Sequence, residues 1–143
     1  CGVPALASSL QTPKETHAVP SSDIDFATAI HFTRLFARRM LELEFPHDVD
    51  VLKLDVPASA TPETPWRLTR ASRHAYFVPV PPQRADPTQP LTLDYARIAD
   101  PGATEPDSDI YALAVDRVVS VAPISIDLTS RADFATLRAL LQE

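Results

Sequence analysis

Three Asp-X-Asp triples, at residues 23–25, 48–50 and 107–109, carry the most suggestive chemistry in the chain. Carboxylate oxygens are the ligands that magnesium and manganese prefer, so each triple has the donors for a hard divalent cation. The first triple lies at a predicted helix start, where carboxylates stabilise the positive end of the helix dipole. The second flanks a predicted strand start. The third lies in a loop before a buried strand, which makes Ser108 and Asp109 the candidates for a position beside a functional site.

The histidines and serines form no self-sufficient catalytic set. His17, His31, His47 and His74 lack the pair spacing typical of zinc ligands. His17 follows a predicted strand, where open parallel sheets bind ligands, although a solvated loop histidine is the commoner interpretation of such a residue. Ser8 and Ser9 share this place but have no glycine elbow and no partner histidine nearby. No catalytic residue and no metal ligand is therefore assigned within the chain.

Bulk composition excludes several classes of function. The chain has 143 residues and a net charge of -6, which disfavours a nucleic-acid partner. No apolar run approaches the roughly 20 residues of a membrane-spanning helix. There is one cysteine, Cys1, which fits a reducing, cytoplasmic setting. The chain has no Asn and only two glycines, so it contains no glycine-rich phosphate loop.

Hydrophobic patterning predicts an α/β fold. The expected strands lie at residues 4–10, 49–56 and 117–122, and short antiparallel strands lie at residues 66–71, 74–80 and 91–98. The last three fall in a Pro-rich insert of hairpins and loops, residues 57–106. After Pro123 the strand is expected to reach an edge or bulge, and residues 124–128 alternate between apolar and polar. A helical turn is expected at residues 110–115.

Two helices are predicted, each with a capping box. The first covers residues 22–45, with Ser22 and Asp25 as the box. Its apolar stripe is Phe26, Ile30, Thr33, Ala37, Met40 and Leu41, widened by Ala29 and Phe36. The second covers residues 130–143, with Ser130 and Asp133 as the box. Its apolar stripe is Phe134, Leu137, Leu140 and Leu141. The chain starts without Met and enters an apolar run by residue 4, so residues 1–143 are expected to be a single incomplete α/β domain.

Four segments in the same order resemble the SurE (survival protein E) nucleotidases. Residues 2–10, GVPALASSL, resemble that family's GIPAIAVSL strand, and residues 51–57, VLKLDVP, are similar to its LLNVNVP. Residues 66–76, WRLTRASRHAY, are similar to its VRVTRxGxRxY hairpin. Residues 107–130 are similar to its GTD…A…YVSVTPLxxDLT segment, with Ser108, Asp109 and Pro123 in matching places. The resemblance spans almost the whole chain.

The resemblance implies a divalent-metal-dependent 5'-nucleotidase that hydrolyses nucleoside monophosphates with magnesium or manganese. It also implies the C-terminal portion of a Rossmann-like three-layer α/β/α sandwich with a projecting antiparallel hairpin. The hairpin and a swapped C-terminal helix would build a homodimer or homotetramer. The family's metal ligands, two Asp of an NDDG motif, a Ser and an Asn, have no counterpart here. They are expected upstream of Cys1, so this segment alone is expected to be inactive.

The departures from the family pattern fall at turns and at the hinge. Ser72 replaces a hairpin glycine, Arg117-Val118 replaces a Gly-Tyr pair, and Arg131 replaces a frequent His after DLT. Asp127 and Arg131 are four residues apart and are expected to pair across the hinge before the docking or swapped helix at residues 130–143. The segment would then supply scaffold and oligomerisation surfaces. The alternative is a non-catalytic interaction or assembly module of the same fold.

Overall fold

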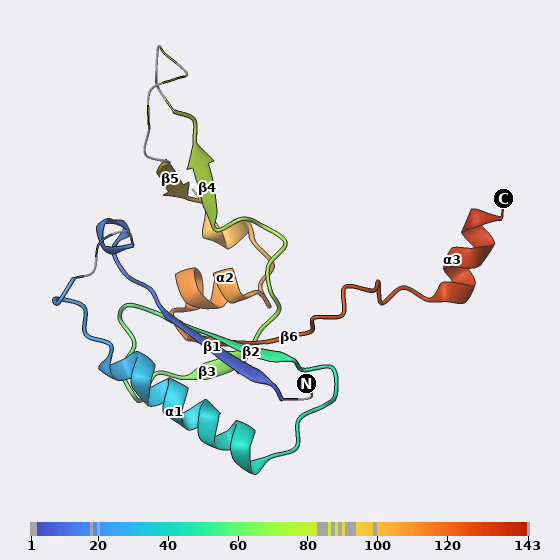
Figure 1. The fold of residues 1–143 in the computed structure, drawn as a ribbon, viewed down its shortest axis with the longest axis horizontal. Helices are drawn as coiled ribbons and strands as arrows, with labels where there is room; N and C mark the ends of the chain where they lie inside the picture. Colours follow the sequence, from blue (N-terminus) through green and yellow to red (C-terminus); the bar gives the residue numbers. More distant parts are fainter. Residues whose placement is uncertain are drawn as a thin grey trace.

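The computed structural model describes residues 3–17, 19, 21–82, 86, 88, 90, 94–98 and 100–142. In this part of the chain, a mixed four-stranded sheet carries one long helix on one face, and a two-stranded hairpin projects from it (Figure 1). An extended arm leaves the sheet and ends in a separate helix. This arrangement is the predicted α/β fold. The elements are β1 (Ala5–Leu10), η1 (Lys14–Thr16), α1 (Ala27–Glu42), β2 (Val51–Val56), β3 (Trp66–Leu68), β4 (Phe77–Val80), β5 (Asp94–Arg97), η2 (Pro101–Ala103), α2 (Asp109–Tyr111), η3 (Ala112–Asp116), β6 (Val119–Ile124) and α3 (Phe134–Leu141).

The strands of the main sheet lie in the order β1-β2-β6-β3. β1 and β2 are parallel and are joined through α1, whereas β6 runs antiparallel to β2. β3 pairs with β6 in parallel, with Trp66 opposite Val119. The prediction for residues 66–71 was therefore wrong in part, because β3 completes the main sheet and does not belong to the projecting hairpin. The amide of Val119 donates to the Pro65 carbonyl and brings the two strands into register.

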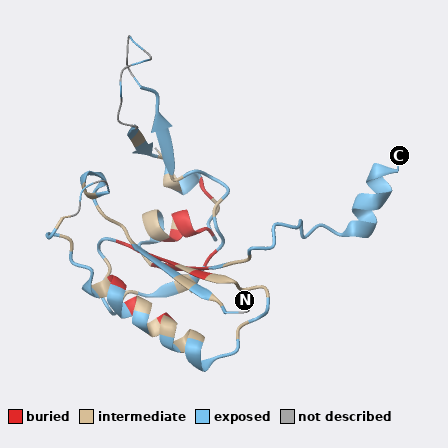
Figure 2. Cartoon of the chain, viewed as in Figure 1, coloured by how far each residue is buried: buried red, intermediate tan, exposed pale blue. Residues whose placement is uncertain are grey.

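The core lies between α1 and the sheet, as the red residues in Figure 2 show. Strand β6 is buried on both faces, as its run of branched residues predicted. The predicted helix stripe was right in part, since Ala29 and Phe36 are buried in the core and Met40 packs against it. Ile30 and Leu41 are exposed, because the bulky Phe32 and Phe36 bury more apolar area when they face the sheet. The buried core residues are Ala29, Phe32, Phe36, Leu52, Leu54, Val56, Val119 and Val121.

Neither predicted capping box forms. Helix α1 begins at Ala27, after Phe26, and its N-cap has no side-chain hydrogen bond. The Ala27 amide instead donates to Asp25 Oδ1 at 2.8 Å, so the acceptor lies three residues closer to the helix than the predicted cap at Ser22. In α3 the cap is Asp133, which accepts from the amides of Ala135 and Thr136. An aspartate beside the first turn satisfies these donors directly.

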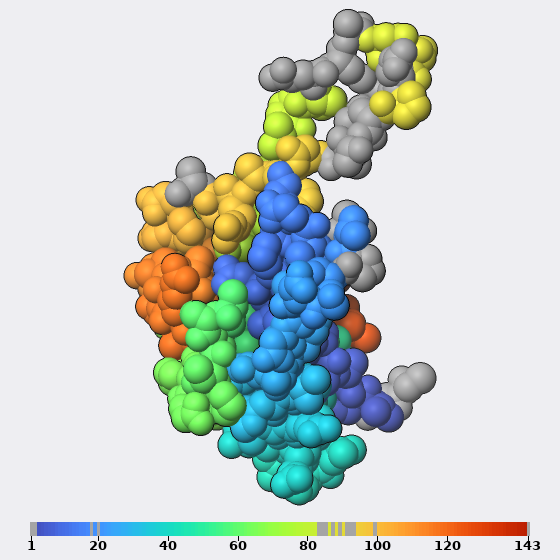
Figure 3. Space-filling model, turned by 90° about the vertical axis from the view of Figure 1, so that its left-hand side faces the viewer, coloured from blue at the N-terminus to red at the C-terminus, as the bar shows by residue number. Residues whose placement is uncertain are grey.

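The projecting hairpin consists of β4 and β5, which pair antiparallel with Phe77 opposite Arg97. This confirms the predicted antiparallel hairpin, although residues 91–93 of its expected strand lie outside the described residues. Figure 3 shows the hairpin standing clear of the body. Its apolar side chains Phe77, Val78 and Val80 are exposed. The predicted helical turn at residues 110–115 is present as α2 and the π-helix η3.

The C-terminal arm differs from the predicted pattern. Pro123 lies within β6 opposite Leu52, and the strand ends at Ile124. The alternation after it does not extend the sheet, since Ile126 and Leu128 are exposed. Arg131 does not pair with Asp127 but donates to Asp48 Oδ1 at 2.8 Å. The Asp127 carboxylate is used locally, where it accepts from the Thr129 amide.

Candidate functional site

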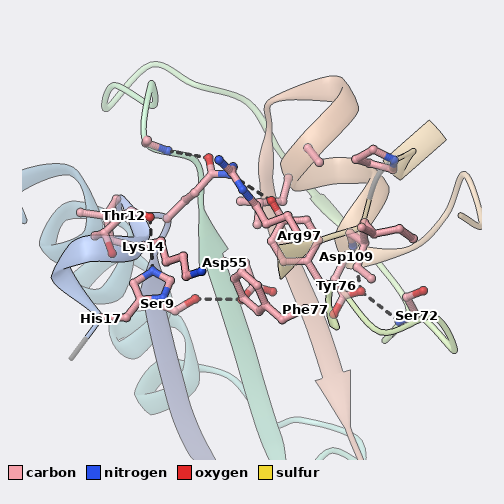
Figure 4. A pocket seen from close by; sticks show the side chains of 18 of the residues that line it. Ser9, Thr12, Lys14, His17, Asp55, Ser72, Tyr76, Phe77, Arg97 and Asp109 are labelled. Carbon is pink, nitrogen blue, oxygen red and sulfur yellow. Dashed lines mark hydrogen bonds between the residues drawn. The ribbon is translucent and has the colours of Figure 1, made fainter. Parts of the chain in front are cut away.

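A cleft of about 1150 Å³ opens at the carboxyl ends of β1 and β2. The base of the hairpin forms one side, and α2 with η3 forms another. Figure 4 shows its labelled side chains converging from β1, β2, the hairpin and the loop around Ser72. In α/β sheets, ligands bind beyond the carboxyl ends of the strands. The cleft therefore lies where the fold favours a binding site.

One lysine bridges two carboxylates in the floor of this cleft. Lys53 Nζ lies 2.7 Å from Asp55 Oδ2 and 2.7 Å from Asp109 Oδ2. Ser9 at the end of β1 donates to Asp55 Oδ1 at 2.8 Å. Asp109 Oδ1 accepts from the Ser72 amide at 2.9 Å. We call Ser9, Lys53, Asp55 and Asp109 the floor cluster, and it ties three separate chain segments together.

Hydrogen bonds in the floor cluster favour the charged forms of Asp109 and Lys53. Burial alone would raise the pKa of Asp109, but hydrogen bonds from Lys53 and from the Ser72 amide lower it overall. Burial alone would lower the pKa of Lys53, but hydrogen bonds to Asp109 and Asp55 raise it overall. Both shifts favour the charged forms. The pair of ions is therefore present across the physiological pH range.

The residues of the cluster do not fit a divalent cation. The ammonium of Lys53 already occupies the space between the two carboxylates where a metal would bind. Within the described part of the chain, no group of three or more His, Cys, Asp or Glu is arranged to hold a metal ion. The two other Asp-X-Asp triples have structural roles. Asp25 accepts at the start of α1, and Asp48 and Asp50 hold the C-terminal arm at Ser125 and Ile126.

Of the two residues predicted to lie beside a functional site, one lines the cleft and the other is buried behind it. Asp109 lines the cleft and belongs to the floor cluster. Ser108 is fully buried behind it, where its Oγ accepts from the Tyr111 amide as the cap of α2. Sequence reasoning missed Lys53 and Asp55. The available signal was their i, i+2 spacing in the otherwise apolar VLKLDV strand, which puts both side chains on one face.

An aromatic wall joins the hairpin to the loop after β1. The ring of His17 lies 5.9 Å from that of Tyr95 at an interplanar angle of 13°, and Phe77 meets Tyr95 edge-on at 5.1 Å. A hydrogen bond links His17 Nδ1 and the Tyr95 hydroxyl, and Lys14 Nζ lies 5.0 Å from the Tyr95 ring centre. His17 lines the cleft and remains exposed to solvent, as the solvated-loop interpretation expects. Such rings offer flat apolar faces for stacking.

The charge of the cleft is opposite to that of the whole chain. Its lining has four cationic residues against three carboxylates, although the chain carries a net charge of -6. The cations are Lys14, Lys53, Arg97 and Arg117, and the carboxylates are Glu15, Asp55 and Asp109. Lys53 pairs with the floor carboxylates and Lys14 pairs with Asp94, so an anionic ligand in the cleft would meet chiefly Arg97 and Arg117.

The fold corresponds to a known class of α/β proteins. The crystal structure of the SurE protein from Aquifex aeolicus matches with a TM-score of 0.58 at 20% identity, covering 98% of this chain and 52% of that chain. At this level of sequence identity the match shows the fold alone. No protein-family model matches the sequence.

Sequence comparison narrows the class to one family. The 5'-nucleotidase SurE of Thermococcus gammatolerans is 38% identical over 141 residues, which cover 98% of this chain and 52% of the relative. That of Thermococcus kodakarensis is 38% identical over 140 residues, covering 97% and 53%. The chain belongs to the SurE 5'-nucleotidase family, and it spans about half the length of these curated relatives.

Proposed function

We propose that this chain is the C-terminal part of a divalent-metal-dependent nucleotidase that hydrolyses nucleoside monophosphates to nucleoside and phosphate. The cleft at the carboxyl ends of β1 and β2 is the observation that supports this function best. It combines a positive lining with aromatic faces, which suits a ligand that has an anionic group and a flat ring. The relatives' names describe the same class of hydrolase.

The charged groups of the cleft indicate which tasks this segment would perform and which it would leave to residues outside it. The Lys53 ammonium occupies the space between the carboxylates of the cleft floor, so the magnesium or manganese ligands are proposed to lie upstream of Cys1. When bound, the metal would supply the activated water for attack on phosphorus. The residues described here would position substrate and exclude water: the floor cluster fixes the cleft, and the aromatic wall faces the nucleoside. In the described residues, no helix is long and apolar enough to cross a membrane, and a cytoplasmic location remains a proposal.

Phosphate release tests the enzyme assignment. The longer protein that contains this segment and the isolated 143-residue chain are each incubated with nucleoside monophosphates and Mn²⁺. We expect turnover by the longer protein and none by the isolated chain, because the metal ligands lie outside it. Turnover by the purified segment would refute the proposed position of the ligands, and a longer protein without turnover would refute the nucleotidase assignment.

An assembly module of the same fold is the second candidate. Helix α3 exposes every residue of its apolar stripe, and the hairpin exposes Phe77, Val78 and Val80. Apolar patches of this kind mark interaction surfaces. We propose that the arm and hairpin join copies of the protein into a homodimer or homotetramer, with Asp127 and Arg131 in the hinge. Light scattering would test this, because removal of residues 130–143 should lower the mass of the assembly.

A further inference from the structure

Arg117 has the one left-handed non-glycine backbone in the described residues, with φ 57° and ψ 38°. It ends the five-residue π-helix η3, and its amide donates to the Ala112 carbonyl. Glycine adopts this conformation without the steric cost that Cβ brings. A π-helix followed by a left-handed residue is a combination found often at functional sites. The long side chain at 117 therefore needs an explanation that the backbone does not supply.

The surroundings of Arg117 supply that explanation. The residue lines the cleft that also contains the floor cluster and the aromatic wall. In the described part of the chain, no carboxylate forms an ion pair with it, whereas Arg67, Arg70 and Arg131 each have an aspartate partner. The two carboxylates of the cleft floor, Asp55 and Asp109, pair with Lys53 and not with Arg117. The guanidinium is thus a cation at a built cleft without a protein anion assigned to it.

We propose that Arg117 binds the phosphoryl group of the substrate in this cleft. The guanidinium fork matches two phosphate oxygens and forms charge-assisted hydrogen bonds to them. Arg117 is exposed to solvent and lines the cleft at the end of η3. This inference rests on the proposed nucleotidase function, and it identifies a substrate-binding cation on the half of the protein that lacks the metal ligands.

Three substitutions in the longer protein test the proposal. Arg117→Gln keeps a polar side chain and removes its charge, Arg117→Gly also relieves the backbone, and Arg117→Lys keeps the charge. KM for a nucleoside monophosphate and the Kd of inorganic phosphate are measured with Mn²⁺, the latter by calorimetry. Loss of a charge-assisted contact is expected to raise both constants about tenfold or more in the Gln and Gly variants. The Lys variant should recover part of the loss.

The controls separate binding from folding. Arg38→Ala removes an exposed charge of α1 that does not line the cleft, so both constants should stay unchanged. Arg117→Gly should melt about 2–4 °C higher than the parent, because the left-handed strain is removed. The proposal is overturned if the Gln variant binds phosphate as tightly as the parent, or if the parent binds no phosphate. A parent that binds phosphate but releases none from nucleotides would overturn the nucleotidase function alone.

Discussion

Strand β6 and helix α3 are both apolar and lie ten residues apart, yet they have opposite environments. In β6, Val119 and Val121 are almost fully buried between β2 and β3. In α3, no residue is buried, and Leu140 and Leu141 are 64% and 77% exposed. Figure 2 shows the same contrast between the centre of the sheet and the arm. The body therefore has a buried core, although some of its apolar residues such as Leu41 and Leu68 are exposed, whereas α3 buries none of its own.

The connection between the two regions is polar. Asp48 accepts hydrogen bonds from Ser125 and from Arg131, and Asp50 accepts from the Ile126 amide. These contacts hold the start of the arm against the loop before β2 but do not bring α3 to the sheet. Order in the body therefore comes from burial, and the direction of the arm comes from a few exposed hydrogen bonds. Substitutions in the two regions should differ accordingly.

The largest difference is expected from matched Leu→Ala substitutions. Leu54→Ala removes a fully buried side chain of β2 and should lower the free energy of unfolding by about 2–5 kcal/mol. Leu140→Ala on α3 should change it by no more than about 0.5 kcal/mol in the monomer. Urea unfolding measures both values. Equal losses of unfolding free energy in the two variants would show that α3 packs on the body of its own chain.

Lys53→Met should have the next largest effect. It leaves Asp55 and Asp109, both nearly buried, without the cation that bridges them. We expect a loss of about 1–2 kcal/mol, the lower part of the usual range for charged hydrogen bonds, because the Lys53 side chain is 39% exposed. Arg131→Met, in the hinge, serves as the control and should leave the urea midpoint unchanged. A Lys53→Met variant with unchanged stability would contradict the role of the floor cluster.

The pH dependence of the Lys53→Met deficit follows from the two pKa shifts. The folded pKa of Asp109 is lowered, so its contribution is complete above the unfolded value of about 3.9 and is lost as pH falls through the folded value. The folded pKa of Lys53 is raised, so its contribution is complete below about 10.4 and is lost at higher pH. The unfolding free energies of the parent and of Lys53→Met, measured from pH 3 to pH 9, should therefore converge only at the acid end. A difference in unfolding free energy between parent and variant that is as large at pH 3 as at neutral pH would contradict this assignment.

The smallest effect on stability is expected in the hinge. Hydrogen bonds from Arg131 and Ser125 lower the pKa of Asp48, but all three groups lie near the surface. Asp48→Asn should leave the melting temperature unchanged and should speed amide exchange in residues 125–131, because the anchor of the arm is weakened. Exchange measured by mass spectrometry tests this. Unchanged exchange would mean that the arm is held by other contacts.

The sequence predicted the parts of the fold that depend on local pattern. The branched run of β6 and the crossover from β1 through α1 to β2 were confirmed. The stripe of α1 was right at Ala29 and Phe36 and wrong at Ile30 and Leu41, because it was chosen by spacing and left out Phe32, which is buried against the sheet. β3 was assigned to the hairpin because its pairing with β6 spans about 50 residues and leaves no local signal.

The candidate site was also predictable only in part, because its residues come from segments that lie far apart in the sequence. Asp109 was identified from its loop before a buried strand, but its partner Lys53 is 56 residues away. The aromatic wall combines η1 with both strands of the hairpin. The residue type at 117 does not predict its left-handed backbone, and the one available signal was the glycine that the family pattern has at this position. Contacts between distant segments, and not residue types, define this site.

Substrate protection of backbone amides tests the central claim most directly, namely that this half of the protein forms one wall of the substrate cleft. Hydrogen exchange of the longer protein is compared with and without a nucleoside monophosphate in the presence of Ca²⁺, which serves as a slow-turnover probe ion. We predict slower exchange at residues 9–17, 72–77 and 109–118, and no change in α3. Protection confined to residues upstream of Cys1, with these three segments unchanged, would contradict the account.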